Sequence, residues 1–255
     1  MVSLNAGDDL RNTVSSILEQ TYDDFEIIVK DGFSKDGSIE KLPEDNRIRV
    51  YQKSDIGIYD AMNQAIDYVS GDFVIYMNCG DMFYSNTVLE DIAAAIDDKD
   101  DYIYYGDCFT ANRNYILKYP DTFNDYVCFT KVLCHQATIY SKKLLEQRRF
   151  NLKYKIAADC EYYVNAYKKG VRIKHLPIVI ATYQGNGASE STKNIKLAIE
   201  EKKRILKENF SKKDYTKAWI KTQLRGVGIK QFLVQRKTFY KIYSKLAKIY
   251  YKYIE

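Results

Sequence analysis

Three aspartates stand where a sheet would gather them into one site. Asp31, Asp55 and Asp81 each follow a short segment rich in apolar, β-branched and aromatic residues, the composition of a strand. Ligands of open α/β sheets bind beyond the carboxyl ends of the strands, and a divalent cation that bridges a diphosphate takes oxygen ligands. The pattern therefore predicts a nucleotide-sugar site. Because aspartate also favours turns and helix caps, a structural role stays open for each loop taken alone.

The elements that must position these residues alternate along the first hundred residues. Apolar runs predict strands, and apolar side chains three and four residues apart predict helices. The expected strands are 2–5, 25–30, 47–52, 73–78 and 102–105; the expected helices are 10–18, capped by Asp8 or Asp9, then 58–69 and 87–96. This order predicts an α/β fold with a mostly parallel sheet flanked by helices. The sequence has no GxxxxGK[ST], and no GxGxxG follows the first strand, which argues against P-loop and dinucleotide-dehydrogenase folds.

Length and composition are those of a globular protein. The 255 residues suffice for one sizeable α/β domain and an appendage. No run of eighteen apolar residues predicts a membrane-spanning helix, and no basic and then apolar leader opens the sequence. The five cysteines are an odd number without a CxxC pair, which favours reduced thiols over disulfides or a zinc site. Only four residues precede Asn5, fewer than a central strand usually has, so we expect a truncated start.

The charge divides the chain in two. Residues 193–255 hold 18 Lys and Arg against 5 Asp and Glu, a net charge of +13, whereas the preceding residues hold 21 against 29, a net charge of −8. We expect a domain over 1–190 and a basic helical extension over 191–255. Within it, 236–255 has an aromatic stripe beside a lysine stripe, which suits an anionic membrane surface and equally a helix packed on its own domain. We expect no nucleic-acid partner, because lysine outnumbers arginine and no RNA-binding motif occurs.

Several blocks in order resemble the family 2 glycosyltransferases, which have the GT-A fold. The chain resembles them over roughly 1–190, and most closely their bacterial polysaccharide-biosynthesis branch. The blocks are SLNAGDDLRNTVSSILEQTYDDFEIIVKDGFSKDGS, SDIGIYDAMNQAIDYVSGDFVIYMNCGD, CHQATIYSKKLL, KIAADCEYY and YQGNGAS. Any one of them alone is a weak signal, and their shared order makes the resemblance specific.

The resemblance implies roles for the residues that match nucleotide-binding positions. Asp31 would accept a hydrogen bond from the base, which is expected to be uracil. Asp55 and Gly57 would line the nucleotide pocket, with Asp60 and Asn63 behind them on the following helix. Glycosyltransferases of this family would use these groups to hold a UDP-sugar donor.

The resemblance also implies a divalent metal, either Mn²⁺ or Mg²⁺. The family's metal motif usually has two or three aspartates, and this chain keeps one, Asp81, in the run Asn78, Cys79, Gly80, Asp81. Asp81 is therefore the expected metal ligand, and diphosphate oxygens would supply most of the remaining coordination. Phe33 stands where the family often has a small residue, and it is expected to narrow the pocket.

Asp159 is the expected catalytic base. Taken alone, an aspartate that opens a helix is typical of an N-cap, but the family's general base falls at this position. An inverting transfer needs one carboxylate to accept the proton of the attacking hydroxyl. We expect Asp159 to open a helix whose Tyr162, Tyr163 and Ala166 face inwards. His135 and Gln136 are expected to begin a strand and to contact the acceptor.

These expectations combine into an inverting, metal-dependent enzyme. It would move a hexose or N-acetylhexosamine from a UDP-sugar to a lipid-linked or glycan acceptor in bacterial surface-polysaccharide biosynthesis, peripherally at the cytoplasmic face of the cell membrane. Because the metal motif keeps only one aspartate, an alternative interpretation is a non-catalytic sugar-nucleotide or glycan-binding module. A basic-tailed adaptor on membrane or RNA is the third reading, and a hydrolytic carboxylate pair is a competing use of the same residues.

Overall fold

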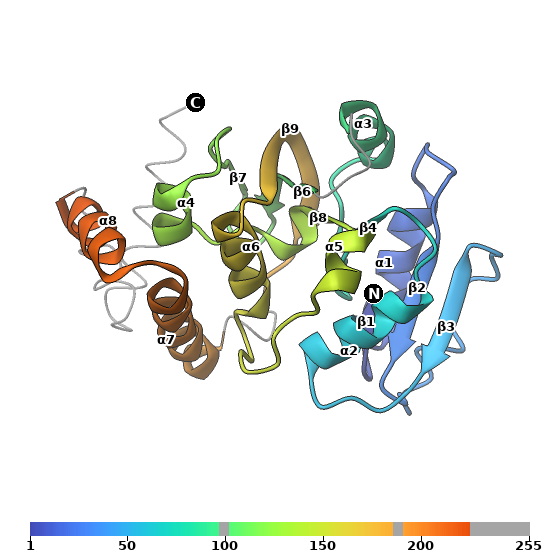
Figure 1. The fold of residues 1–255 in the computed structure, drawn as a ribbon. Helices are drawn as coiled ribbons and strands as arrows, with labels where there is room; N and C mark the ends of the chain where they lie inside the picture. The colour runs from blue at the N-terminus through green and yellow to red at the C-terminus, as the bar shows by residue number, and fades with distance from the viewer. Residues whose placement is uncertain (97–101, 186–190, 225–255) are drawn as a thin grey trace.

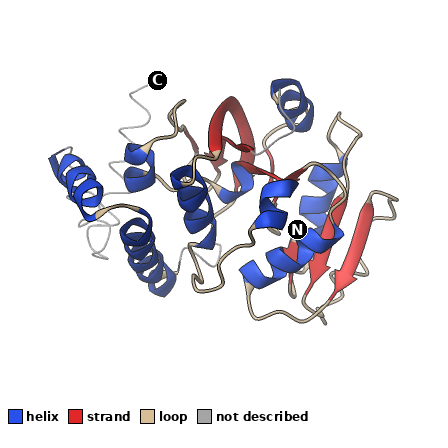
Figure 2. Ribbon diagram, in the orientation of Figure 1, coloured by secondary structure: helices blue, strands red, loops and turns tan. Residues whose placement is uncertain are grey.

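The computed structural model describes residues 1–96, 102–185 and 191–224, and its first sheet is parallel. Strands β1 (Val2–Ser3), β2 (Ile27–Asp31) and β3 (Ile48–Gln52) lie in that order. The register places Ser3, Asp31 and Gln52 side by side at the carboxyl ends of the strands. Figure 2 shows this sheet at one side of the molecule, with helices packed against it.

The second sheet corrects the expectation of a mostly parallel sheet. Its strand order is β4-β8-β6-β9-β5, and β7 pairs with β6. Only β6 and β9 pair in parallel; the other pairs are antiparallel. The α/β class is as predicted, but the sheets together are mixed. The strands are β4 (Phe73–Ile75), β5 (Met82–Phe83), β6 (Tyr102–Thr110), β7 (Tyr115–Leu117), β8 (Thr138–Ser141) and β9 (Arg172–Tyr183).

The helices that cover the first half of the chain bury the faces that their spacing predicts. Helix α1 (Asp8–Leu18) buries Leu10, Val14 and Ile17, and α2 (Ile58–Ala65) buries Met62 and Ala65 before a 3₁₀ turn, η1 (Ile66–Tyr68). Helix α3 (Val88–Ala95) follows β5. Neither Asp8 nor Asp9 caps α1, because Gly7 takes that position with φ 56°.

The remaining helices surround the second sheet. They are η2 (His135–Ala137, a 3₁₀ helix), α4 (Asp125–Thr130), α5 (Lys142–Gln147), α6 (Ala158–Lys168), α7 (Thr192–Asn209) and α8 (Lys212–Leu224). Figure 1 shows α7 and α8 beside α6 and α4, on the side of the molecule away from the first sheet. None of the helices described here has the length and apolar character to cross a membrane. The predicted helix at 236–255 lies outside the described residues.

An aromatic core fixes the orientation of α6. Phe150 packs on Tyr76, Tyr140 and Tyr162, with ring centroids 5.2 to 5.9 Å apart. All four side chains are at most 2 % exposed. Edge-to-face contacts of this kind add to the gain from burying the rings. Tyr162, Tyr163 and Ala166 are buried as expected, so the start of α6 is held firmly against the sheet.

A cavity separates the amino-terminal ends of β2 and β4. Its volume is about 650 Å³, and its lining includes Ile27, Ile28, Phe73 and Ile75. The amino group of Met1 is buried at this cavity and donates to the Ile28 carbonyl oxygen at 2.6 Å. Burial lowers the pKa of this amino group to about 6, because the charged form loses its hydration. Strand β1, which begins directly after this amino group, comprises Val2–Ser3.

Candidate active site

Asp31 lies at the end of β2, fully buried, and it organises the loop after the strand. Its Oδ2 accepts from the backbone N of Ser34 at 2.8 Å and from Nε2 of Gln52 at 3.0 Å, and its Oδ1 accepts from the Ser34 hydroxyl. Phe33, in the loop between Asp31 and Ser34, has φ 67° and is 52 % exposed. Sequence reasoning missed Gln52, although the strand register that aligns it with Asp31 follows from the expected pairing of two parallel strands.

Asp55 is paired with a buried lysine. Lys30 is fully buried and forms an ion pair with Oδ2 of Asp55, while Oδ1 accepts from the Gly57 backbone N at 3.2 Å. Gly57 has φ 145° and ψ 173°, a conformation that is essentially restricted to glycine. Asp55 thus neutralises a buried cation and shapes the loop that leads into α2. In the sequence, the only sign that Lys30 has a special role is that a lysine stands in a strand expected to be buried.

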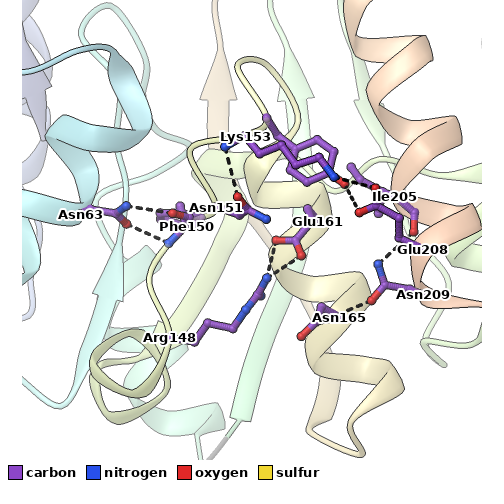
Figure 3. Close-up of polar contacts among 11 residues, drawn as sticks. Asn63, Arg148, Phe150, Asn151, Lys153, Glu161, Asn165, Ile205, Glu208 and Asn209 are labelled. Atoms are coloured by element: carbon purple, nitrogen blue, oxygen red, sulfur yellow. Dashed lines mark hydrogen bonds and ion pairs between the residues drawn. The ribbon is translucent and has the colours of Figure 1, made fainter.

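Asp60 and Asn63 form contacts behind this loop. Asp60 Oδ2 accepts from the backbone N of Ile56 at 3.0 Å. The Asn63 amide exchanges two hydrogen bonds with the backbone of Phe150, at 2.9 and 2.8 Å. Figure 3 shows this pair joining α2 to the segment that follows α5. Asp60 therefore stabilises the Asp55 loop, and Asn63 links the two halves of the molecule.

Asp81 lies beyond β4 in a buried, acidic environment. It is 5 % exposed, and its Oδ1 accepts from the Gln184 backbone N at 2.9 Å while its Oδ2 accepts from Nε2 of Gln136. Burial raises the pKa of Asp81, and the negative charge of Asp9 raises it further, against the hydrogen bonds from Gln184 and Gln136. Strand β4 ends at Ile75 and not at Asn78, so Asp81 is reached by a longer loop than the sequence predicts.

The donor chemistry around Asp81 fits a hard divalent cation in part. Asp81 and Asp9 offer carboxylate oxygens, the ligands that Mn²⁺ and Mg²⁺ prefer. Burial is the main cause of the raised pKa of Asp81, and a cation would offset both this burial and the repulsion by Asp9. Among the described residues, however, no group of three His, Cys, Asp or Glu could hold a metal ion. The protein alone therefore supplies an incomplete set of ligands.

Asp159 lies in the first turn of α6, and its two oxygens have different surroundings. Oδ1 is 2.9 Å from the hydroxyl oxygen of Tyr59, which donates to it, and 2.8 Å from the backbone N of Cys160. Oδ2 lies 3.6 Å from Nδ1 of His135. The N-cap of α6 is Ala157, so Asp159 is not the cap of this helix. Sequence reasoning missed Tyr59, which is 100 residues away along the chain.

His135 and Gln136 form a 3₁₀ turn, which corrects the expectation that they begin a strand; β8 starts at Thr138. Side chains of consecutive residues in such a turn point about 120° apart, and these two reach different carboxylates. His135 faces Asp159 and stacks on Tyr76, with ring centroids 5.4 Å apart. Gln136 donates to Asp81.

Within the part of the chain that the structure describes, neither ring nitrogen of His135 has a hydrogen-bond partner. Burial lowers the pKa of His135, and the nearby Asp159 opposes the shift. The imidazole is therefore neutral near pH 7, with one nitrogen able to donate and one able to accept. An unsatisfied polar ring in a buried position is suited to a ligand.

The curled α/β fold and this set of carboxylates are those expected of a glycosyltransferase. The model of Glycosyl transferase family 2 matches residues 1–176, and the chain belongs to that family. A "PGL/p-HBAD biosynthesis glycosyltransferase" of Mycobacterium bovis is 27% identical over 201 residues, which are 74% of this chain and 77% of the relative. The Escherichia coli "UDP-Glc:alpha-D-GlcNAc-diphosphoundecaprenol beta-1,3-glucosyltransferase WfgD" is 31% identical over 123 residues, 46% of this chain and 47% of WfgD.

Solved structures support the fold. TarS 1-349 of S. aureus in complex with UDP has a TM-score of 0.60 at 20% identity, covering 82% of this chain and 68% of that one. The mannosyltransferase PcManGT of Pyrobaculum calidifontis, in complex with GDP-Man and Mn²⁺, has a TM-score of 0.60 at 13% identity and covers 100% of this chain and 86% of its own. At these identities the likeness concerns the arrangement of the backbone.

Proposed function

We propose that this glycosyltransferase moves a hexose or N-acetylhexosamine from a UDP-sugar to a lipid-linked or glycan acceptor, with inversion and with a divalent metal. WfgD is named for a UDP-glucose donor and a diphosphoundecaprenol-linked acceptor, and TarS was solved with UDP. These relatives support a UDP-sugar and a lipid-linked acceptor. The proposed role in surface-polysaccharide biosynthesis comes from the sequence resemblance.

One observation carries the proposal. Consecutive residues of one 3₁₀ turn contact the two carboxylates that the reaction needs: His135 faces Asp159, and Gln136 donates to Asp81. This arrangement supports a single site for the proposed proton acceptor and the phosphate end of the donor. A transferase requires this, because the attacking hydroxyl and the departing diphosphate lie on opposite sides of one sugar carbon.

The two oxygens of Asp159 suggest how the proton moves. Oδ1 already accepts from Tyr59 and Cys160, so Oδ2 is the oxygen that takes the proton of the acceptor hydroxyl. As the new bond to the anomeric carbon forms, the bond to the diphosphate oxygen breaks, and UDP leaves with the electron pair. Neutral His135 is placed to hold the acceptor or a phosphate oxygen. A general base such as the one proposed for Asp159 contributes about 10²–10⁴-fold to the rate.

The donor is held at the carboxyl ends of β2 and β3 and at Asp81. Asp31 orients the uracil base, and Asp55 and Gly57 line the nucleotide pocket. Asp60 and Asn63 support that pocket from behind. Asp81 would bind the metal, either Mn²⁺ or Mg²⁺, with diphosphate oxygens completing the coordination; such a cation offsets charge on the leaving group.

The basic extension would bring the enzyme to its acceptor. The proposed extension begins at residue 191, yet α7 buries Ile205 and Leu206 in the same core as α6. Helix α8 exposes Trp219 and Ile220 beside several lysines. Apolar and basic groups together bind anionic lipid surfaces, so the proposed location is peripheral, on the inner face of the cell membrane.

Calorimetric titration with UDP tests the donor site. Binding should require Mn²⁺ or Mg²⁺, be abolished by EDTA and be lost in Asp81→Ala, because Asp81 would hold the metal that offsets the charge of the diphosphate. The control is Asp24→Asn, which removes an exposed carboxylate in the loop before β2, and it should bind like the unchanged protein. Absence of UDP binding in the presence of metal would overturn the UDP-sugar proposal.

A further inference from the structure

Helix α7 lies beyond the residues that the family model matches, yet it carries a buried carboxylate aimed at the start of α6. Glu201 is 1 % exposed. Its Oε1 accepts from the backbone N of Lys155 at 2.8 Å, and its Oε2 accepts from the backbone N of Ile156 and Ala157 at 3.0 and 2.9 Å. One side chain thus satisfies three consecutive backbone N–H groups.

These three bonds fix the backbone that leads into α6. Hydrogen bonds to an ionised carboxylate are roughly twice as strong as neutral ones, and a negative charge is favourable at a helix N-terminus. Ala157 is the N-cap of α6, and Asp159 follows two residues later. Any movement of this backbone is therefore passed directly to the proposed base.

Ile156 connects Glu201 to Asp159 by a second route. Its N–H donates to Glu201, and its carbonyl oxygen lies 2.8 Å from the Tyr59 hydroxyl oxygen. The same hydroxyl oxygen lies 2.9 Å from Oδ1 of Asp159. Glu201 consequently holds one end of the contact that orients the carboxylate.

Two further side chains of α7 contact the same segment, just before residues 155–157. Glu208 accepts from Nζ of Lys153 at 2.7 Å and from the Tyr154 hydroxyl at 2.6 Å, and these bonds, that from Lys153 foremost, lower the pKa of Glu208. Arg204 lies over the Tyr154 ring, 4.9 Å from its centroid. Figure 3 shows Lys153 reaching towards Glu208 while Phe150, earlier in the same segment, is held by Asn63 of α2.

We infer that Glu201 is a positioning residue for glycosyl transfer, which orients Asp159 through the backbone of residues 155–157. The inference rests on the proposed function, in which Asp159 is the base. It makes α7 a necessary part of the catalytic apparatus, although the helix lies outside the family match.

Glu201→Gln tests this, with Glu200→Gln as the matched control, because Glu200 is the preceding residue of α7 and is exposed. UDP release from UDP-glucose or UDP-N-acetylglucosamine is measured with an undecaprenyl-diphosphate-linked sugar as acceptor. We expect kcat of Glu201→Gln to fall about 10- to 100-fold, because small misplacements of a catalytic group have effects of this size. The KM for the donor and the calorimetric affinity for UDP should stay within about twofold of the control.

Hydrogen exchange gives a readout that needs no donor. The amides of residues 155–157 should exchange faster in Glu201→Gln than in Glu200→Gln, while the amides of β2 are unchanged. Glu201→Asp, which keeps the charge on a shorter side chain, should restore part of kcat. Equal kcat and equal exchange in the Gln variants would overturn the inference, as would a loss of UDP affinity that matches the loss of kcat.

Asp159→Asn separates this inference from the proposed function. If Asp159→Asn keeps the full rate, Asp159 is not the base and the proposed function fails, whatever Glu201 does. If Asp159→Asn is inactive while Glu201→Gln behaves like Glu200→Gln, only the positioning role is refuted.

Discussion

The nucleotide side of the site and the Asp159 side are built in different ways. Beyond β2 and β3, each carboxylate has a partner close in sequence, Ser34 for Asp31 and Gly57 for Asp55. Their other partners, Gln52 and Lys30, are 21 and 25 residues away. Around Asp159, the partners are distant, since Tyr59 is 100 residues away and Glu201 reaches back over 44 to 46. Local partners make a loop that one short motif can specify. Distant partners make a site that exists only when the whole chain has folded.

The largest effect on turnover should come from a substitution on the Asp159 side of the site. Asp159→Asn keeps the shape of the side chain and removes its basicity, so kcat should fall by about 10²–10⁴-fold. UDP binding in Mn²⁺, measured by calorimetry, should be unchanged, because Asp159 is not in the proposed donor pocket. A loss of UDP affinity as large as the loss of kcat would show that the nucleotide side and the Asp159 side do not act independently.

Substitutions at two asparagines compare the stability that comes from distant and from local hydrogen bonds. Asn63→Ala removes two hydrogen bonds to the backbone of Phe150, 87 residues away, and leaves those backbone groups unpaired. The free energy of unfolding should drop by about 1–3 kcal/mol, measured by urea titration. Asn151→Ala removes a hydrogen bond to Lys153, only two residues on, and should cost less than Asn63→Ala. Equal losses would contradict the comparison.

A smaller effect, of defined sign, should appear with pH. Burial lowers the pKa of His135 from 6.5, so below about pH 6.5 the unfolded chain binds a proton that the folded chain does not. The unfolding free energy should therefore fall as the pH drops from 6.5 through the lowered pKa, by at most about 1.4 kcal/mol per pH unit from this group. His135→Gln should show a shallower dependence between pH 6.5 and 5. Identical slopes would mean that His135 is protonated as readily in the fold as outside it.

Much of the first half of the chain follows from its periodicity. Helices α1 and α2 bury the apolar stripes that their spacing marks, and β2 and β3 lie within two residues of their expected limits. Asp31, expected directly after β2, is the last residue of that strand. These elements are specified by neighbours in sequence and by one buried face, which are the properties that a pattern can reveal.

The errors arise where tertiary contacts decide the structure. The apolar run 73–78 predicts one strand, but only Phe73–Ile75 pairs with β8; Tyr76 instead enters the aromatic core and donates to the Met62 carbonyl oxygen. His135 and Gln136 form a 3₁₀ turn, and their side chains face two carboxylates that lie far away in the sequence. Strand direction in the second sheet depends on partners that lie far apart in the chain, and no local pattern encodes it.

The hydroxyl of Tyr59 has a single hydrogen and two acceptors within reach, the Ile156 carbonyl and Asp159. An ionised carboxylate is the stronger acceptor, and a carbonyl surpasses it once the carboxylate has been neutralised. Rotation about one C–O bond is enough to move the hydrogen between them while every heavy atom stays in place. With such a neighbour, the proposed base could gain and lose its proton in each turnover without the surrounding structure having to relax.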